Sequence, residues 1–133
     1  MAESHYHYAL GRRKSSTARV RLQNGKGGFV INGKNVKDFF NNSKPLLHKL
    51  GQPFSVVDID PMKYDLSVVV KGGGLTGQVE AIRLAIAKSL VIMNPDLKST
   101  LKRADLLGRD PREKERKKPG LRSARKQRQF TKR

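Results

Sequence analysis

The sequence predicts a two-layer sandwich of the α+β or α/β class, followed by an extended basic arm. Residues 18–22 alternate apolar and polar side chains, which is typical of a half-buried strand, and residues 66–71 have the β-branched composition of a strand. Residues 77–93 are mostly apolar and have the length of a helix that packs on a sheet. Composition changes near residue 107, so we expect a globular domain over 1–106 and an arm over 107–133.

The first expected strand, residues 18–22, has Arg19 and Arg21 on its outward face. Residues 24–28 are rich in Gly and Asn and predict a turn. Residues 29–31 are apolar and predict a returning strand. Because the turn is short, we expect these two strands to form a hairpin.

Two short helical segments are expected next. Residues 36–40 predict one helical turn, and residues 43–50 predict a short helix with Ser43 as its N-cap. Gly51 follows that helix and Pro53 lies just beyond, which is typical of a helix end. The helix is therefore expected to stop at residue 50.

The remaining part of the domain predicts a short strand at 54–57, a stronger strand at 66–71 and two helices. The inward face of the stronger strand consists of Leu66, Val68 and Val70. Three glycines end that strand, and the main helix follows over 77–93. Asn94 and Pro95 end this helix and begin another, which runs to about residue 105.

Composition excludes several classes of protein. The chain has 133 residues, with 29 Lys and Arg against 11 Asp and Glu, a formal net charge of +18. It has no Cys, which excludes disulfides, thiolate metal sites and a Cys nucleophile. No apolar run approaches the roughly 18 residues of a membrane helix, and the first residues lack an export signal, so we expect a cytoplasmic protein. The simplest explanation of the charge is a constant polyanionic partner.

The last quarter of the chain, residues 101–133, carries more than half of the net charge. Residues 1–100 hold 15 basic and 7 acidic residues, whereas 101–133 hold 14 basic and 4 acidic residues. Residues 116–133 contain no acid and few apolar side chains, so we expect the arm to order only on a polyanion. Within it, residues 110–117 favour one or two helical turns. Fully extended, the arm's residues would span roughly 90 Å.

Two glycine motifs suggest nucleotide sites but lack the required context. Residues 72–77 match GxGxxG between a strand and a helix, yet no second strand with an acidic tip follows. Close packing of helix and strand explains these glycines, and phosphate contact at the helix amides is compatible with that packing. Residues 28–34 match GxxxxGK, but Asn35 stands where a magnesium-binding hydroxyl belongs.

Other candidate chemistry is incomplete. His5 and His7 share one strand face, as do Asp58 and Asp60, but neither pair has further ligands placed to complete a metal site. No nucleophile elbow is present. We therefore expect no enzyme activity, no cofactor and no small-molecule substrate.

A basic loop carries the strongest binding signal. In residues 11–16, Gly-Arg-Arg-Lys-Ser-Ser, three cations precede two hydroxyls, a combination that suits phosphate oxygens. Arg19 and Arg21 extend the same basic strip, although an ordinary solvated charge run remains an alternative. The arm adds closely spaced cations without an apolar face, which argues against a membrane surface.

Taken in order, these segments resemble the bacterial form of the small-subunit ribosomal protein nine family. The resemblance covers nearly the whole chain. It rests on Gly11-Arg12-Arg13-Lys14-Ser15-Ser16, Ala18-Arg19-Val20, Val30-Ile31-Asn32-Gly33, Val70-Lys71-Gly72-Gly73-Gly74, Gly77-Gln78, Ala81-Ile82-Arg83, Arg109-Asp110, Arg112, Glu115-Arg116-Lys117-Lys118 and Gln129-Phe130-Thr131-Lys132-Arg133. Residues 41–65 follow the family less closely.

The resemblance implies a fold of the ribosomal protein five second-domain type, with a left-handed crossover. It implies a structural protein of the small ribosomal subunit, bound to the 3′ (head) domain of its rRNA. Small-subunit proteins seven, ten and fourteen would be neighbours. The end of the arm, Lys132 and Arg133, would contact the peptidyl-site tRNA.

Charge pattern and resemblance together predict a set of rRNA contacts. The predicted residues are Arg12, Arg13, Lys14, Ser15, Arg19, Arg21, Lys71, Gly72, Gly73, Gly74, Arg83, Arg109, Arg112, Arg116, Lys117, Lys118, Arg122, Arg125, Lys126 and Arg128. Two other hypotheses remain open from the residues alone. A general nucleic-acid packaging protein would bind random duplex DNA, and a nucleotide-using enzyme would bind ATP or NAD.

Overall fold

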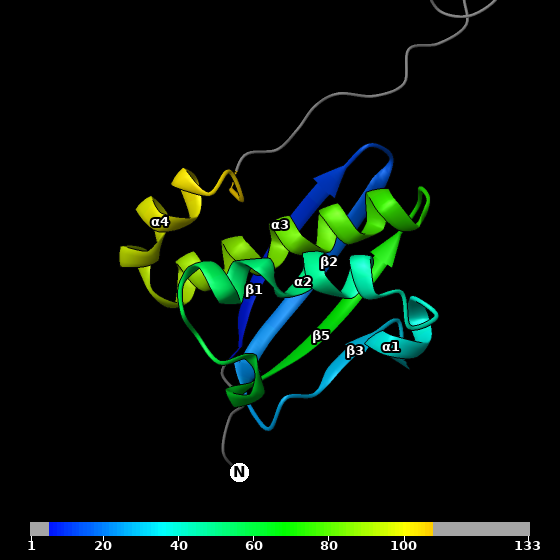
Figure 1. Cartoon of the computed structure of the whole chain (residues 1–133), viewed down its shortest axis with the longest axis horizontal. Helices are drawn as coiled ribbons and strands as arrows, with labels where there is room; N and C mark the ends of the chain where they lie inside the picture. Colours follow the sequence, from blue (N-terminus) through cyan, green and yellow to red (C-terminus); the bar gives the residue numbers. More distant parts are fainter. Residues whose placement is uncertain (1–5, 108–133) are drawn as a thin grey trace, which may run out of the picture.

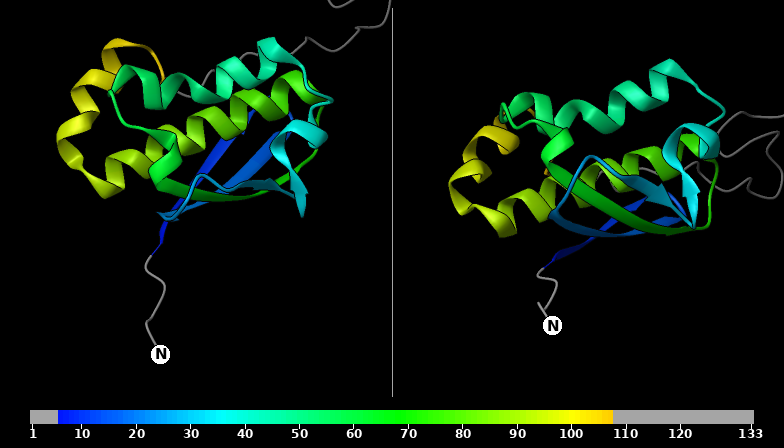
Figure 2. Two further views of the ribbon diagram at one scale, coloured as in Figure 1. Left: turned by 60° about the horizontal axis from the view of Figure 1, so that its bottom comes forward. Right: turned by 90° about the horizontal axis from the view of Figure 1, so that it is seen from below.

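The computed structural model describes residues 6–107, which form two layers. A twisted five-stranded sheet forms one layer, and the helices cover only one of its faces (Figures 1 and 2). The predicted two-layer α/β architecture is therefore confirmed. The other face of the sheet carries no helix of the described chain, as the edge-on views in Figure 2 show.

The sheet has the strand order β1-β2-β5-β3-β4. Its strands are β1 (His7–Arg13), β2 (Ser16–Asn24), β3 (Phe29–Ile31), β4 (Lys34–Asn35) and β5 (Tyr64–Lys71). Strand β3 runs parallel to β5, and all other neighbouring pairs are antiparallel. The two strongest predicted strands, β2 and β5, pair along their whole length in the centre of the sheet.

The predicted hairpin of residues 18–31 is wrong, because β5 lies between β2 and β3. The connecting loop is held to β5 by Asp65, whose carboxylate accepts hydrogen bonds from the backbone N–H groups of Lys26 (3.0 Å) and Gly28 (2.8 Å). The actual hairpin joins β1 to β2 through Lys14 and Ser15. Sequence analysis did not predict β1, and so it left β2 without its true partner.

The helices are α1 (Val36–Phe39), α2 (Lys44–Val56), α3 (Leu75–Met93) and α4 (Lys98–Arg103), with 3-10 turns at Pro61–Lys63 and Pro95–Leu97. The helical turn predicted at 36–40 is confirmed. The main helix is also confirmed and begins two residues earlier than predicted. The helix predicted after Pro95 is present, with a 3-10 first turn.

Helix α2 continues where the sequence predicted an end. It runs through Gly51 and Pro53, so the strand predicted at 54–57 is wrong. The ring of Pro53 and the side chain of Phe54 are buried, and this packing offsets the hydrogen bond that a proline removes from a helix. Ser43 occupies the predicted N-cap position, but its side chain makes no capping hydrogen bond.

The core lies between the sheet and α3, which crosses β1 and β2 on the helix side (Figure 1). Side chains of the inward sheet face, including Val20, Leu22 and Val68, pack against Val79, Ile82 and Ile86 of α3. The approach is closest at Gly11, where α3 lies against the backbone of β1. Leu101 and Leu106 close the core near the end of the described residues.

Candidate RNA interface

The predicted contact residues within the described part of the chain separate into three places. Arg12, Arg19, Arg21 and Lys71 lie on the sheet face that no helix covers. Lys14, Ser15 and the glycines at 72–74 form a corner at one end of the sheet, beside Arg13. Arg83 lies in the helix layer.

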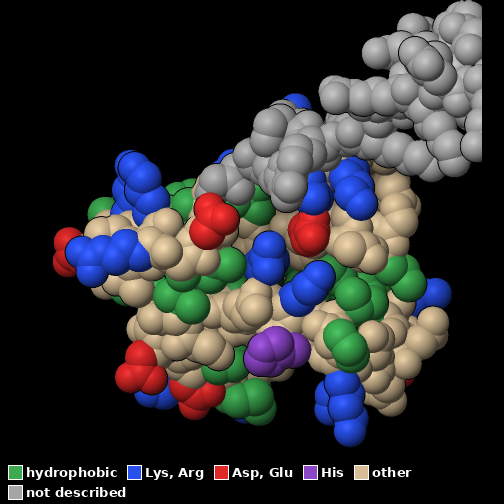
Figure 3. Space-filling view, turned by 45° about the horizontal axis from the view of Figure 1, so that its top comes forward, with side chains coloured by type: hydrophobic (Ala, Val, Ile, Leu, Met, Phe, Trp, Pro, Cys, Tyr) green, Lys and Arg blue, Asp and Glu red, His purple; other side chains and the backbone are tan. Residues whose placement is uncertain are grey.

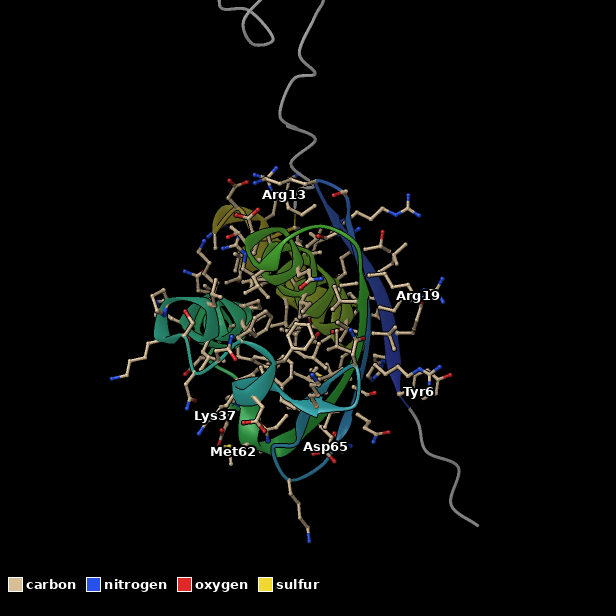
Figure 4. The ribbon with its side chains drawn as sticks, turned by 90° about the vertical axis from the view of Figure 1, so that its right-hand side faces the viewer. Tyr6, Arg13, Arg19, Lys37, Met62 and Asp65 are labelled. Atoms are coloured by element: carbon tan, nitrogen blue, oxygen red, sulfur yellow. The ribbon has the colours of Figure 1, made fainter. Side chains whose placement is uncertain are left out.

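The open sheet face follows from the alternation of its strands. Residues with their side chains toward the helices, such as Ala18, Val20 and Val68, are buried, whereas Arg19 and Arg21 between them are exposed. In Figure 4, where the sheet is seen near its edge, the side chain of Arg19 extends away from the helices. The predicted outward orientation of both arginines is confirmed.

Strand register arranges these cations in rows across three strands. The rows, from β1 through β2 to β5, are Tyr8–Arg21–Ser67, Leu10–Arg19–Val69 and Arg12–Thr17–Lys71. Neighbouring strands are about 4.8 Å apart, so each row brings its side chains into mutual contact range. The result is a surface on which every row holds at least one cation.

The corner is built around Ser16, which is buried. Its Oγ donates a hydrogen bond to the carbonyl oxygen of Gly72 (2.9 Å), and Gln78 Nε2 donates to the same oxygen (3.2 Å). Gly72 and Gly73 have φ values of 78° and 67°, a region that favours glycine. A Cβ on Gly72 would lie 2.5 Å from the Ser15 carbonyl oxygen, and one on Gly73 would overlap Ser16 Oγ. These glycines therefore allow two backbone segments to meet, as the packing interpretation of GxGxxG expects.

Arg13 is oriented differently from its neighbour Arg12. Its Nε forms a hydrogen-bonded ion pair with Glu80 Oε2 of α3, and both side chains are largely buried. Figure 4 shows Arg13 at the end of the sheet beside the helices. The pair fixes the β1–β2 hairpin to α3, so the three consecutive cations of the basic loop do not share one surface.

Arg83 lies apart from the other predicted residues. Its Nη1 donates a hydrogen bond to Gln52 Oε1 of α2 (2.8 Å) and thereby connects the two helices. Because α3 covers the inward face of the sheet, Arg83 and the open-face cations lie in different layers. The two places would have to meet different parts of a large partner.

Sequence analysis missed two tyrosines of the open face. Tyr6 and Tyr8 are 47% and 44% exposed, and the Cζ atom of Arg21 lies 5.1 Å from the centroid of the Tyr6 ring. Such a distance is typical of a cation–π contact. The signal was available in the sequence, since Tyr6, Tyr8, Leu10 and Arg12 are spaced two residues apart, but β1 was not predicted.

The two faces of the domain differ in charge. The helix-side surface in Figure 3 mixes Lys and Arg with Asp and Glu. Asp65 is the acidic residue among those of β1, β2, β3 and β5 whose side chains point away from the helices. It lies at one end of β5, and its carboxylate already accepts hydrogen bonds from backbone N–H groups of the 24–28 loop. The open face is therefore the more suitable of the two for a polyanion.

The remaining predicted contacts, from Arg109 to Arg133, lie outside the described residues, as do His5 and the helical turns predicted at 110–117. Within 6–107, no three His, Cys, Asp or Glu side chains gather as a metal site would require. None of the helices in that range combines the length and apolar character needed to cross a membrane.

Comparison with known proteins gives a consistent result. A family model described as ribosomal protein S9/S16 matches residues 11–133. The small ribosomal subunit protein uS9 of Cytophaga hutchinsonii is 51% identical over 125 residues, which cover 94% of this chain and 96% of that protein. The uS9 protein of Mycoplasmoides gallisepticum is 54% identical over 124 residues, or 93% and 94% of the two chains.

Proposed function

We propose that this chain binds the 3′ (head) domain of small-subunit rRNA. The chain belongs to the ribosomal protein S9/S16 family and is a structural, non-enzymatic constituent of the small ribosomal subunit. Family membership alone names neither the rRNA domain that is bound nor the surface of this chain that binds it. The main support for the proposal is the open sheet face, where Arg12, Arg19, Arg21 and Lys71 are exposed together. Each cation that neutralises a phosphate releases counterions, which is the main source of affinity for RNA.

The corner beside this face supplies a second group of contacts in the proposal. Lys14 and Ser15 are exposed at the hairpin turn, next to the exposed glycines 72–74. A point charge, a hydroxyl and accessible backbone N–H groups are suited to phosphate oxygens. A duplex backbone or a folded loop of rRNA could therefore contact the face and the corner at once.

The C-terminal arm is proposed to extend this interface beyond the domain. Its cations from Arg109 to Arg128 would neutralise rRNA phosphates, and Lys132 and Arg133 would contact the peptidyl-site tRNA. Arg133 has a planar guanidinium that suits bidentate phosphate contact, whereas Lys132 adds a point charge. We further propose small-subunit proteins seven, ten and fourteen as neighbours, and a cytoplasmic location with the ribosome.

We also propose that the domain has the ribosomal protein five second-domain fold with its left-handed crossover. The parallel strands β3 and β5 are adjacent, and α1 and α2 connect them on the helix side. Seen from that side in Figure 1, the chain leaves β3 and returns into β5 to its left, which supports a left-handed connection. Most connections of this type are right-handed, so the handedness is diagnostic.

The rRNA proposal is tested by filter binding of the full chain to transcribed head-domain rRNA over a series of salt concentrations. Arg19→Ala should reduce the slope of log affinity against log salt by about 1, because one phosphate contact is lost. Lys37→Ala is a matched control, since Lys37 is an exposed cation on α1, away from Arg19 in Figure 4. Equal affinity for the rRNA and for random duplex DNA would instead favour a packaging protein.

The tRNA proposal needs a separate measurement. Subunits reconstituted with a chain that lacks residues 131–133 should assemble normally but bind peptidyl-site tRNA more weakly. Unchanged tRNA affinity at every salt concentration would contradict this role of the arm.

A further inference from the structure

We propose that the open sheet face is a stacking surface for unpaired rRNA bases, with Tyr8 on the edge strand β1 as its main ring and Tyr6 and Arg21 beside it. This inference rests on the proposed function, because it specifies how the same face contacts rRNA. The observation that requires it is the exposure of aromatic and apolar side chains among the cations. Phosphate contacts alone would leave these rings in water.

The open face combines aromatic, apolar and cationic side chains. Tyr6 and Tyr8 are each nearly half exposed, and Val30 and Val69 on the same face are 40% and 47% exposed. Tyr8 pairs in register with Arg21, and Val69 pairs with Arg19. Rings, apolar groups and guanidinium groups therefore alternate across the strands. The planar faces of bases stack on both aromatic rings and guanidinium planes.

Part of this surface is preorganised for binding. Arg21 lies over the Tyr6 ring, with 5.1 Å from its Cζ atom to the ring centroid. This contact restrains a long side chain that would otherwise sample many rotamers, so less conformational entropy is lost when a base or phosphate binds. Tyr6 and Arg19 both lie on the side of the sheet away from the helices in Figure 4.

The charge of the open face favours RNA over a protein partner. The cations on this face are Arg12, Arg19, Arg21 and Lys71, and the outward carboxylate of Asp65 already accepts two backbone hydrogen bonds. A protein surface large enough to cover the tyrosines would also need several carboxylates aligned with these cations. An RNA strand provides phosphates and base faces together, so it complements both features of the surface.

The exposed rings of the open face favour unpaired bases over a duplex. In an A-form helix the base faces are covered by their neighbours, and a protein meets mainly phosphates and 2′-hydroxyls. A duplex would therefore leave the exposed rings of Tyr6 and Tyr8 without partners. A loop, bulge or junction of rRNA presents bases that can lie on the rings while its phosphates reach the arginines.

The experiment compares full-length chains with Tyr8→Phe, Tyr8→Leu and Tyr8→Ala in filter binding to transcribed head-domain rRNA. Tyr8→Phe should bind as tightly as the original chain, because the ring remains. Tyr8→Leu and Tyr8→Ala should each bind about tenfold more weakly, since one base–aromatic contact is lost. Their salt slopes should stay unchanged, because stacking releases no counterions.

A second measurement maps the contact directly. Small subunits reconstituted with the full chain are irradiated to form zero-length crosslinks, and the crosslinked peptides are identified by mass spectrometry. We expect a crosslink between Tyr8 or Tyr6 and an rRNA nucleotide that is unpaired in the secondary structure. This measurement needs no variant, so it remains decisive if Tyr8→Ala does not fold.

Each other result overturns the inference. Unchanged affinity of Tyr8→Ala, or an rRNA affinity of Tyr8→Leu equal to that of Tyr8→Phe, would show that no base stacks there. A crosslink from Tyr8 to another protein would assign the face to a protein partner. If the original chain shows no salt-dependent binding to head-domain rRNA, the proposed function fails together with the stacking inference. If the original chain binds but the Tyr8 variants bind equally well, only the stacking inference fails.

Discussion

Gly11 of β1 lies in direct contact with the backbone of Ala81 in α3. A Cβ added to Gly11 would overlap the carbonyl oxygen of Ala81 and lie 2.7 Å from the amide nitrogen of Ala85. Since both groups belong to the helix backbone, no side-chain rotation can relieve the overlap. Gly11 stands at the start of a motif that sequence analysis assigned to phosphate contact, but the structure gives it a role in packing.

Gly11→Ala should therefore lower the free energy of unfolding by about 3 kcal/mol, the upper part of the range for overpacked cores. Gly51→Ala is the control, because Gly51 lies within α2 and nothing is within 4 Å of its added Cβ. That substitution should stabilise the protein by about 0.5–1 kcal/mol. Urea unfolding followed by circular dichroism measures both. Similar stability for the two variants would contradict the close approach of β1 and α3.

Asn32 extends the pairing of β3 with β5 through its side chain. Its Oδ1 accepts a hydrogen bond from the N–H of Val70 (2.9 Å), and its Nδ2 donates to the Val70 carbonyl (3.0 Å). Its φ is 51°, a value that Gly tolerates better than Ala. Asn32→Gly should destabilise the protein by about 2 kcal/mol, because both side-chain hydrogen bonds are lost. Asn32→Ala should destabilise it by about 3 kcal/mol, because Ala also has the cost of a Cβ at positive φ. A higher melting temperature for Asn32→Ala than for Asn32→Gly would argue against the left-handed conformation of residue 32.

Ser16 connects the β1–β2 hairpin to the glycine turn after β5. Ser16→Ala removes the donor to the Gly72 carbonyl, and we expect a loss of about 1 kcal/mol in unfolding free energy. Ser15→Ala, at the exposed neighbouring position, should change stability by less than about 0.5 kcal/mol. Chemical denaturation of the two variants side by side tests the difference, and equal effects would mean that the hydroxyl of Ser16 contributes nothing specific.

Asp65 should affect stability and RNA binding in opposite directions. Asp65→Ala removes the acceptor for Lys26 and Gly28, so we expect a loss of about 2 kcal/mol in stability. The same change removes a carboxylate from a cationic surface and should strengthen rRNA binding at low salt. Asp65→Asn keeps an acceptor oxygen and should retain more of the stability with the same gain in affinity. Weaker rRNA binding by Asp65→Asn would place the RNA on another surface.

Much of the fold follows from local patterns, whereas the order of the strands does not. The alternation of Val20 and Leu22 with arginines, and of Leu66 and Val68 with polar or exposed neighbours, predicted β2 and β5. The turn at 24–28 looked like a hairpin because a short Gly-rich link usually joins paired strands. The insertion of β5 depends on pairing between residues 37 to 54 positions apart, which no local pattern contains.

Helix α2 shows a second limit. Gly51 and Pro53 are ordinary signals of a helix end, and the helix continues because Pro53 and Phe54 are buried in the core. At the candidate site, alternation within β2 predicted that Arg19 and Arg21 point outward. The tyrosines were missed because β1 was not predicted, and the inward orientation of Arg13 depends on Glu80, 67 residues away.

The strand order also constrains how the chain folds during its own synthesis. β5 occupies the middle of the sheet, yet it is the last strand of the described residues to be translated. A nascent chain that ends before residue 64 has β2 and β3 but lacks the strand that joins them, so its sheet has unpaired edges of the kind that promote aggregation. The first half of this domain therefore cannot complete its sheet until β5 emerges from the ribosome, and chaperone binding to the nascent chain should be strongest before that point.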